Sequence, residues 1–220
     1  MRSVNECFDN VKEDYFKFLN KEKILGKSKA EKIKSLKKIY IPISFWIENK
    51  YKKKGETLFL GFCGGQGSGK TTVTRILKII LTKFFERRIH VSSIDEFYKT
   101  SKDRIKMANE IHPLFKTRGV PGTHDINLVK NFFDIIKKKK FKKIKLPKFE
   151  KAADNRLKKK YWYNIKQKPE IVILEGWCVG AKPQSSSLIK KPINILEKSE
   201  DKDLKWRKYT NEKLKKEYKK

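Results

Sequence analysis

The strongest constraint on this chain is the stretch Leu58–Thr72, which reads LFLGFCGGQGSGKTT. Its first six residues are apolar and rich in aromatic side chains, which predicts a buried strand, and the residues after Lys70 favour a helix. Between them the sequence fits G-x-x-x-x-G-K-[ST], the pattern of a phosphate-binding loop. Strand, complete pattern and helix follow in this order, so a plain flexible glycine turn is a poor alternative.

The residue types in this loop follow from the chemistry of a triphosphate. A loop that curls round phosphates must aim successive N–H groups inward, which residues without a Cβ tolerate most easily. Lys70 is expected to reach the β and γ phosphates of ATP, and Thr71 to offer its hydroxyl to Mg²⁺. The residues expected to bind the nucleotide are Gly64, Gly65, Gln66, Gly67, Ser68, Gly69, Lys70, Thr71 and Thr72.

Composition restricts the classes of partner. With 220 residues and 38% hydrophobic residues, the chain suits one substantial globular domain. Its 56 Lys and Arg against 25 Asp and Glu give a net charge of +31, which on its own would suit a nucleic-acid ligand. The lysines are scattered, however, Arg is scarce, and no zinc-finger spacing or aromatic RNA-binding signature occurs. We therefore expect no specific nucleic-acid partner, and a lysine-rich surface that steers anionic small molecules.

Cysteine usage and hydropathy indicate the compartment. Cys7, Cys63 and Cys178 are far apart and form no C-x-x-C pair, which suits a reducing environment and argues against a disulfide framework or a zinc site. The apolar runs are too short to cross a bilayer, and acidic residues occupy the positions where a signal peptide needs an apolar core. The sequence predicts a cytoplasmic protein without membrane association.

Hydrophobic periodicity predicts an N-terminal helical extension, residues 1–55, and a main domain, residues 56–220. The extension should contain a helix, an apolar segment that begins near Pro42, and a polar turn, at Val4–Leu19, Ile39–Ile47 and Lys50–Glu56. The main domain should contain the strands Leu58–Cys63, Ile89–Ile94 and Ile171–Leu174. Its helices are expected from Lys70 to near Arg87, and over Lys99–Ala108, Asn127–Lys140 and Leu204–Lys219, with irregular structure at Leu146–Arg156 and Gly180–Ser187.

Two of these strands run into carboxylates. Asp95 follows Ile89–Ile94, and Glu175 follows Ile171–Leu174, whose consecutive aliphatic residues are typical of a fully buried parallel strand. Open α/β sheets build their sites at the carboxyl ends of such strands. Between them, the stretch RGVPGTHD holds two glycines and a proline, so it must be a loop, and it presents Arg118, His124 and Asp125.

The order of these features resembles a known family, the phosphate-loop small-molecule kinases related to phosphoribulokinase, uridine kinase and pantothenate kinase. Among them it is most similar to the D-glycerate 3-kinases of plants and cyanobacteria with their fungal relatives. The residues that carry the resemblance are GGQGSGKTT (Gly64–Thr72), SIDEFY (Ser93–Tyr98), HPLFKTRGVPGTHD (His112–Asp125), LPKFEKAADNR (Leu146–Arg156) and LEGWCVGAKP (Leu174–Pro183). The chain departs from the family at Glu96, where a second aspartate is usual.

The resemblance implies an α/β fold of the phosphate-loop NTPase type, a mostly parallel sheet flanked by helices in three layers (α/β/α). The family continues beyond Lys220 into further strands and a lid over ATP, so its C-terminal strands are missing from these 220 residues. We therefore expect Leu58–Cys63 to form an edge of the sheet, and the 220-residue chain to be a weak kinase.

The resemblance also implies a reaction, transfer of the γ-phosphoryl group of ATP to a hydroxyl of D-glycerate, with Mg²⁺. Lys70 would hold the phosphates, Asp95 would accept the proton of the attacking hydroxyl, and Thr71 and Glu175 would serve the metal. A helix N-cap is the alternative for Asp95, and a structural acceptor for loop amides is the alternative for Glu175.

Glycerate is an anion, so its carboxylate needs cationic partners. Arg118 suits a carboxylate best, because its guanidinium binds bidentately. His124 is a candidate for a substrate hydroxyl or, equally, for a residue that fixes its loop, and Asp125 is expected to cap the helix that follows. Further substrate candidates are Lys148, Lys151 and Arg156. Two other functions stay open, a kinase for another metabolite such as uridine, pantothenate or a phosphoribulokinase-like substrate, and a phosphate-loop ATPase that acts on nucleic acid.

Overall fold

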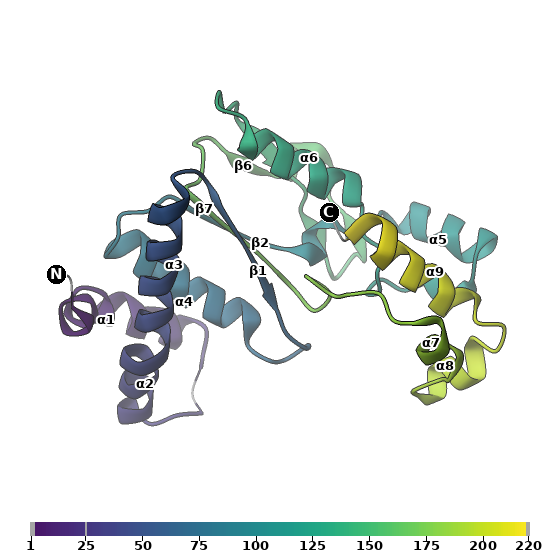
Figure 1. The fold of residues 1–220 in the computed structure, drawn as a ribbon, viewed down its shortest axis with the longest axis horizontal. Coiled ribbons are helices and arrows are strands. Elements are labelled where there is room, and N and C mark those ends of the chain that lie inside the picture. The colour runs from purple at the N-terminus through teal and green to yellow at the C-terminus, as the bar shows by residue number, and fades with distance from the viewer. Residues whose placement is uncertain (1–2, 25, 219–220) are drawn as a thin grey trace. The chain divides into compact units, whose positions relative to one another are not determined.

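The structure is a computed structural model that describes residues 3–24 and 26–218 (Figure 1). Its helices are α1 (Val4–Lys21), α2 (Lys29–Ser35), α3 (Ile41–Lys54), α4 (Lys70–Lys83), α5 (Ser101–Glu110), α6 (Ile126–Lys137), α7 (Ser186–Lys190), α8 (Ile195–Glu200) and α9 (Lys205–Lys213). Its strands are β1 (Leu58–Cys63), β2 (Ile89–Ser93), β3 (Ile144–Leu146), β4 (Phe149–Glu150), β5 (Asn155–Arg156), β6 (Tyr163–Ile165) and β7 (Ile171–Gly176). None of the described helices is both long enough and apolar enough to cross a bilayer.

The described residues divide into two compact units. The first comprises those within Met1–Ser92 and Lys168–Glu175, and the second those within Ser93–Gln167 and Gly176–Lys220. The predicted domain boundary after residue 55 falls inside the first unit and stays a prediction.

The main sheet confirms the predicted α/β class. It is parallel and flanked by helices, with the strand order β1-β7-β2. Strand β7 is therefore central, and Ile171, Val172 and Ile173 are at most 1% exposed, as its run of aliphatic residues predicts. Within the described part of the chain β1 forms an edge of this sheet, also as expected.

The N-terminal helices share their core with the helix that follows the phosphate loop. Helix α1 begins at Ser3, whose side chain forms a capping box with Glu6, which confirms the helix predicted there. Its buried residues recur every fourth position, so they form one apolar stripe that packs in the same core as α4. The residues of the two stripes are Cys7, Val11, Tyr15 and Leu19 of α1 and Ile76, Leu77, Ile80 and Leu81 of α4.

Several predicted boundaries in the first unit were wrong. The predicted polar turn at Lys50–Glu56 is helical as far as Lys54, and the chain breaks only at Gly55, which has the left-handed φ of +69° that suits a helix C-cap. The lysines in the last turn of this helix are favourable there, because their positive charges lie at the negative end of the helix dipole. Helix α4 ends at Lys83 rather than near Arg87, and Glu86 then adopts a left-handed φ of +58° that no helix continues.

The second unit holds two small antiparallel pairs. Ile144 of β3 pairs with Ile165 of β6, and Phe149 of β4 pairs with Arg156 of β5. The prediction that Leu146–Arg156 is irregular was therefore wrong, because β4 and β5 form a short hairpin there. Helices α7 and α8 were not predicted. The helix predicted to end at Lys219 is present as α9 and a π-helical turn, Leu214–Tyr218, and its last predicted residue lies outside the described residues.

A buried ion pair ties α3 to the segment after α4. Arg87 donates from Nε and Nη2 to the two carboxylate oxygens of Glu48, over 2.9 and 2.5 Å, and Glu48 is only 2% exposed. Burial acts to raise the pKa of Glu48, but the hydrogen bonds and charge of Arg87 bring this pKa below its ordinary value. Arg87 also faces Glu170, just before β7, which accepts the hydroxyl of Tyr51 over 2.9 Å.

We expect Arg87→Ala to lower the free energy of unfolding by about 3 kcal/mol near neutral pH, because Glu48 would keep its buried charge without its partner. A group whose folded-state pKa is lowered contributes stability above its unfolded pKa and loses it as the pH falls through the folded pKa. The penalty of the substitution should therefore shrink in acid, where Glu48 is protonated. Urea denaturation at neutral and acidic pH measures this.

Lys52→Ala is the matched control, because Lys52 reaches the same carboxylate at 3.4 Å from an exposed position. It should change the free energy of unfolding by no more than about 0.5 kcal/mol. Losses of equal size in the two variants would contradict the assignment of the stabilisation to Arg87.

Candidate functional site

The phosphate loop joins β1 to α4, and its backbone needs glycine. Gly67 and Gly69 have φ of +75° and +81°, a left-handed conformation that other residues rarely adopt. A Cβ on Gly64 would lie 2.8 Å from Ser68 Oγ and 3.1 Å from Lys70 Cγ. The loop is therefore wound closely around its own side chains, in keeping with the reason given for its glycines.

Two predicted site residues that are far apart in sequence meet beside this loop. Thr71, in the first turn of α4, donates its hydroxyl to Glu175 Oε1 over 3.0 Å. Glu175 is 5% exposed and is the last residue but one of the central strand β7. Next to Thr71, Lys70 Nζ donates to the carbonyl of Gly65 over 2.8 Å, so its ammonium group lies at the loop. The hydroxyl and the carboxylate are hard oxygen donors, which is the type of ligand that Mg²⁺ prefers, so these residues fit the implied metal.

Asp95 lies on a 3₁₀ turn, Ile94–Phe97, directly after β2. The residue that caps this turn is Ser93, whose hydroxyl accepts the N–H of Asp95 over 3.3 Å, so the N-cap alternative for Asp95 is not what the structure shows. Asp95 Oδ2 accepts from Lys151 Nζ over 3.4 Å. Its neighbour Glu96 has a different task, because it accepts the N–H of Phe149 over 2.8 Å.

Arg118 is held by a carboxylate that the sequence did not single out. Its guanidinium forms an ion pair with Asp154 and lies 5.4 Å over the ring of Phe149. Arg104, which is fully buried, holds Asp154 from another side, donating to its carboxylate over 2.8 Å and to its carbonyl over 2.6 Å. Burial acts to raise the pKa of Asp154, but the two arginines hold it below its ordinary value. In the sequence Arg104 looks like any arginine on a surface helix, so no local signal identifies this trio.

The other predicted substrate residues have defined partners in the same unit. Arg156 pairs with Asp125 over 3.0 Å, and Asp125 accepts the N–H of Leu128, which confirms the predicted cap of α6. Lys148 Nζ lies 5.6 Å from the centroid of the Tyr163 ring. These contacts show where the basic side chains lie. That they bind a substrate stays a prediction.

His124 lies in the interior. It is 1% exposed, its ring stacks on Tyr98 with 4.4 Å between centroids, and its Nδ1 lies 2.7 Å from the hydroxyl of Tyr218. Tyr218 also accepts the N–H of Gly122 over 3.0 Å, so one hydroxyl holds the RGVPGTHD loop at two points. This placement favours the loop-fixing alternative for His124. No local pattern indicates that Tyr218, nearly a hundred residues away, is its partner.

The predicted residues thus fall into two sets. Lys70, Thr71 and Glu175 belong to the first compact unit, together with the whole phosphate loop. The predicted base and the predicted substrate residues belong to the second unit and comprise Asp95, Arg118, His124, Lys148, Lys151 and Arg156.

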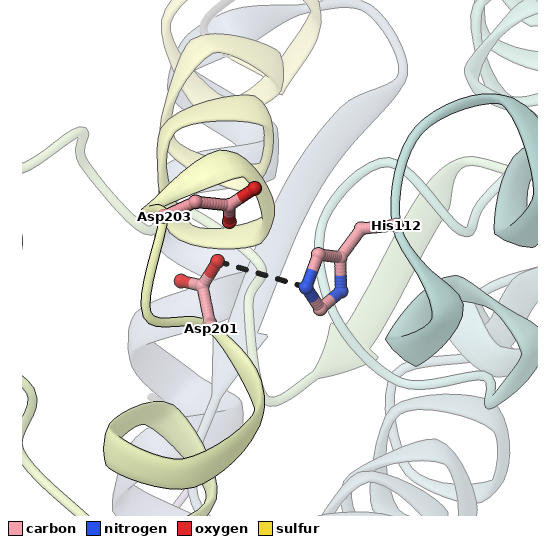
Figure 2. A group of neighbouring side chains, drawn as sticks. All are labelled: His112, Asp201 and Asp203. Carbon is pink, nitrogen blue, oxygen red and sulfur yellow. Dashed lines mark ion pairs between the residues drawn. The ribbon is translucent and has the colours of Figure 1, made fainter.

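A separate group of His112, Asp201 and Asp203 has the composition of a metal site, but its side chains are already engaged (Figure 2). His112 Nδ1 accepts the N–H of Leu114 over 3.3 Å, and Nε2 donates to the carbonyl of Glu200 over 3.0 Å. Asp201 is buried and accepts from Arg207 Nε over 2.7 Å. A cation would have to displace these bonds. The group is therefore better explained as a structural cluster, called the clip below, that connects the start of α9 to the segment after α5.

Burial keeps the ring of His124 neutral and lowers its pKa to about 4. Burial likewise lowers the pKa of His90 to about 4. We expect both values in an NMR titration of the ring protons. Because the unfolded chain titrates near about 6.5, it binds more protons than the folded protein between these values, and stability should fall as the pH falls from about 6.5 toward 4. His124→Gln should reduce this slope. A ring that titrates near 6.5 would contradict the burial.

The named relatives found by comparison with known proteins are kinases. No family model matches the chain. A protein of Schizosaccharomyces pombe named uncharacterized kinase mug58 is 32% identical over 162 residues, which covers 70% of this chain and 58% of that protein. The chloroplastic D-glycerate 3-kinase of Arabidopsis thaliana is 28% identical over 168 residues, covering 69% of this chain and 37% of that protein.

The fold has a solved counterpart. The D-glycerate 3-kinase from Cryptococcus neoformans superposes with a TM-score of 0.65 at 22% identity, covering 80% of this chain and 67% of that one, which supports the fold. The chain spans about half the length of the curated relatives it matches. All the relatives named for these matches are kinases. The phosphate-loop motif is complete in this chain. These likenesses support the phosphate-loop kinase family for this chain.

Proposed function

We propose that this chain provides the catalytic part of an ATP-dependent kinase that transfers the γ-phosphoryl group to a hydroxyl of D-glycerate. The observation that carries the proposal is the hydrogen bond of 3.0 Å between Thr71 and Glu175, which sets a hydroxyl and a buried carboxylate beside the phosphate loop. Relatives named D-glycerate 3-kinase support the choice of acceptor, although other kinases match as well. We propose a small-molecule acceptor and a cytoplasmic location, without a nucleic-acid or membrane partner.

The phosphate side of the reaction would be the task of the first unit. Phosphoryl transfer needs little covalent chemistry from the protein, so positioning and charge stabilisation dominate. Lys70 and the amides of Gly64–Thr72 would hold the phosphates. Thr71 and Glu175 would hold Mg²⁺, which neutralises charge on phosphate oxygens when it is bound.

The acceptor side would be the task of the second unit. Asp95 would accept the proton of the attacking hydroxyl, and its present partner Lys151 is exposed and free to exchange toward an anion. Arg118 would bind the carboxylate of the acceptor, with Asp154 and Phe149 setting the plane of its guanidinium. Lys148 and Arg156 would add positive charge, and His124 would keep the loop in shape.

ATP turnover with a panel of acceptors tests the proposal. The panel is D-glycerate, L-glycerate, glycolate, uridine and pantothenate, each with the 220-residue chain and Mg²⁺. We expect kcat/KM for D-glycerate to exceed kcat/KM for each other acceptor at least about tenfold. The reason is that a poorer acceptor leaves hydrogen-bonding groups of the site unpaired. A preference for uridine or pantothenate would show that D-glycerate is not the acceptor. Hydrolysis of ATP that only nucleic acid stimulates would overturn the kinase proposal.

Lys70→Ala should abolish phosphoryl transfer and weaken ATP binding, because the ammonium group at the phosphate loop is lost. The thermal unfolding midpoint should stay close to that of the unchanged chain. Lys78→Ala, an exposed lysine two turns further along α4, is the matched control and should turn over normally. Unaltered turnover of the Lys70 variant would refute the nucleotide site.

Arg118→Ala should raise the KM for the acidic acceptor far more than the KM for ATP, since a charge-assisted bidentate hydrogen bond is lost only on the acceptor side. A rise of about tenfold or more is expected. Lys116→Ala, an exposed neighbour on the same segment, is the matched control. Equal effects of the Arg118 substitution on both KM values would assign Arg118 to the scaffold or to a phosphate.

A further inference from the structure

The second unit contains a cavity of about 330 Å³ that the proposed reaction does not use. One wall is the face of α9 that carries Trp206, Arg207 and Thr210. The facing walls include Val120 of the RGVPGTHD loop, Trp177 and Leu188. All of these residues belong to the second unit, so the cavity lies within one compact body.

Three donor atoms, each on a residue of α9 that lines this cavity, have no hydrogen-bond acceptor among the described residues. They are the buried atoms Trp206 Nε1, Arg207 Nη1 and Thr210 Oγ1. Buried polar groups in folded proteins are paired in the great majority of cases. A threonine hydroxyl inside a helix usually bonds the carbonyl four residues earlier, and Thr210 makes no such bond here. Three unpaired donors on adjacent turns of one helix indicate that an acceptor group belongs among them.

Arg207 is fixed in place by Asp201, one of the residues drawn in Figure 2. Its Nε donates to Asp201 Oδ2 over 2.7 Å, and its Nη2 donates to the carbonyl of Asp201 over 2.8 Å. The side chain is 8% exposed, so the guanidinium is held rigidly and out of water. Nη1 forms an ion pair with Glu197 Oε2 at 3.7 Å, beyond hydrogen-bond distance, and the same Oε2 accepts the N–H of Ile193 over 2.9 Å. Nη1 is therefore preorganised for a further acceptor.

We infer that this cavity binds a small monocarboxylate with an apolar body. An acceptor is required because Trp206 Nε1 and the guanidinium can only donate. An anion is favoured because Lys182 and Lys191 line the cavity, while its single lining carboxylate, Glu197, already forms an ion pair with Arg207. The aromatic and aliphatic side chains of the walls would bury the rest of the molecule, and the volume lies at the lower end of the range for ligand pockets.

Binding to the 220-residue chain in the absence of ATP tests this inference, so its outcome does not depend on the proposed kinase reaction. The probes are 4-methylpentanoate and phenylacetate, with their amides and acetate as comparisons. Calorimetry and tryptophan fluorescence report binding, because Trp177 and Trp206 line the cavity. We expect saturable binding of one carboxylate per chain, and binding about tenfold or more weaker for the amides, which lack the charge, and for acetate, which lacks the apolar body.

Two conservative variants identify the site. Thr210→Val removes one donor and nearly keeps the shape of the side chain, and Trp206→Phe removes one donor together with one ring of the indole. Each should weaken binding of the carboxylates about tenfold. Thr117→Val and Trp46→Phe are the matched controls, because both residues are exposed and neither lines the cavity. The thermal unfolding midpoint of each variant verifies its fold.

Absence of saturable binding would overturn the inference and leave water as the partner of the three donors. Equal affinity for carboxylates and amides would overturn it as well. Equal affinity of the unchanged chain and of the folded Thr210 and Trp206 variants would place any binding elsewhere. If a variant fails to fold, the series of probes on the unchanged chain still decides the matter.

Discussion

The buried strand β7 organises the first unit, because an acid stands at each end of it. At its start Glu170 faces Arg87 and Tyr51, which ties the strand to α3 and to the segment after α4. At its end Glu175 accepts the hydroxyl of Thr71. The strand itself has no charged residue between them and is buried against both neighbours in the sheet. A shift of β7 along its axis would move both carboxylates at once, so the packing of an aliphatic strand fixes the candidate metal ligand.

Carboxylates are scarce in this chain, and in the second unit they hold arginines. Asp154 holds Arg104 and Arg118, Asp201 holds Arg207, and Asp125 holds Arg156. The planar guanidinium loses less conformational entropy per hydrogen bond than a lysine would, and it keeps donors free for a ligand. Because the net charge is +31, exposed lysines can attract anions to the surface. The few ion-paired arginines can then hold an anion in a defined orientation.

The local patterns of the sequence were enough for the elements that local chemistry controls. The strand and the helix that flank the phosphate-loop motif, the aliphatic strand β7, the helix α1 and the cap at Asp125 were all predicted correctly. Each depends on residues within a few positions of one another. The boundaries that failed, at Gly55 and Lys83, are ones where a single left-handed residue decides the end of a helix. Composition near such a residue does not reveal its φ.

The sequence by itself determined that the chain has a phosphate loop, a parallel α/β sheet and two strand-end carboxylates, because hydrophobic period and glycine spacing are local properties. Only the tertiary structure decided which groups pair. Thr71 and Glu175 are 104 residues apart, Arg104 and Asp154 are 50 apart, and His124 and Tyr218 are 94 apart. The clip at Asp201 and the unpaired donors of α9 likewise depend on how distant segments pack. Such pairs form because burial makes an unpartnered polar group costly, and that cost is absent until the chain has folded.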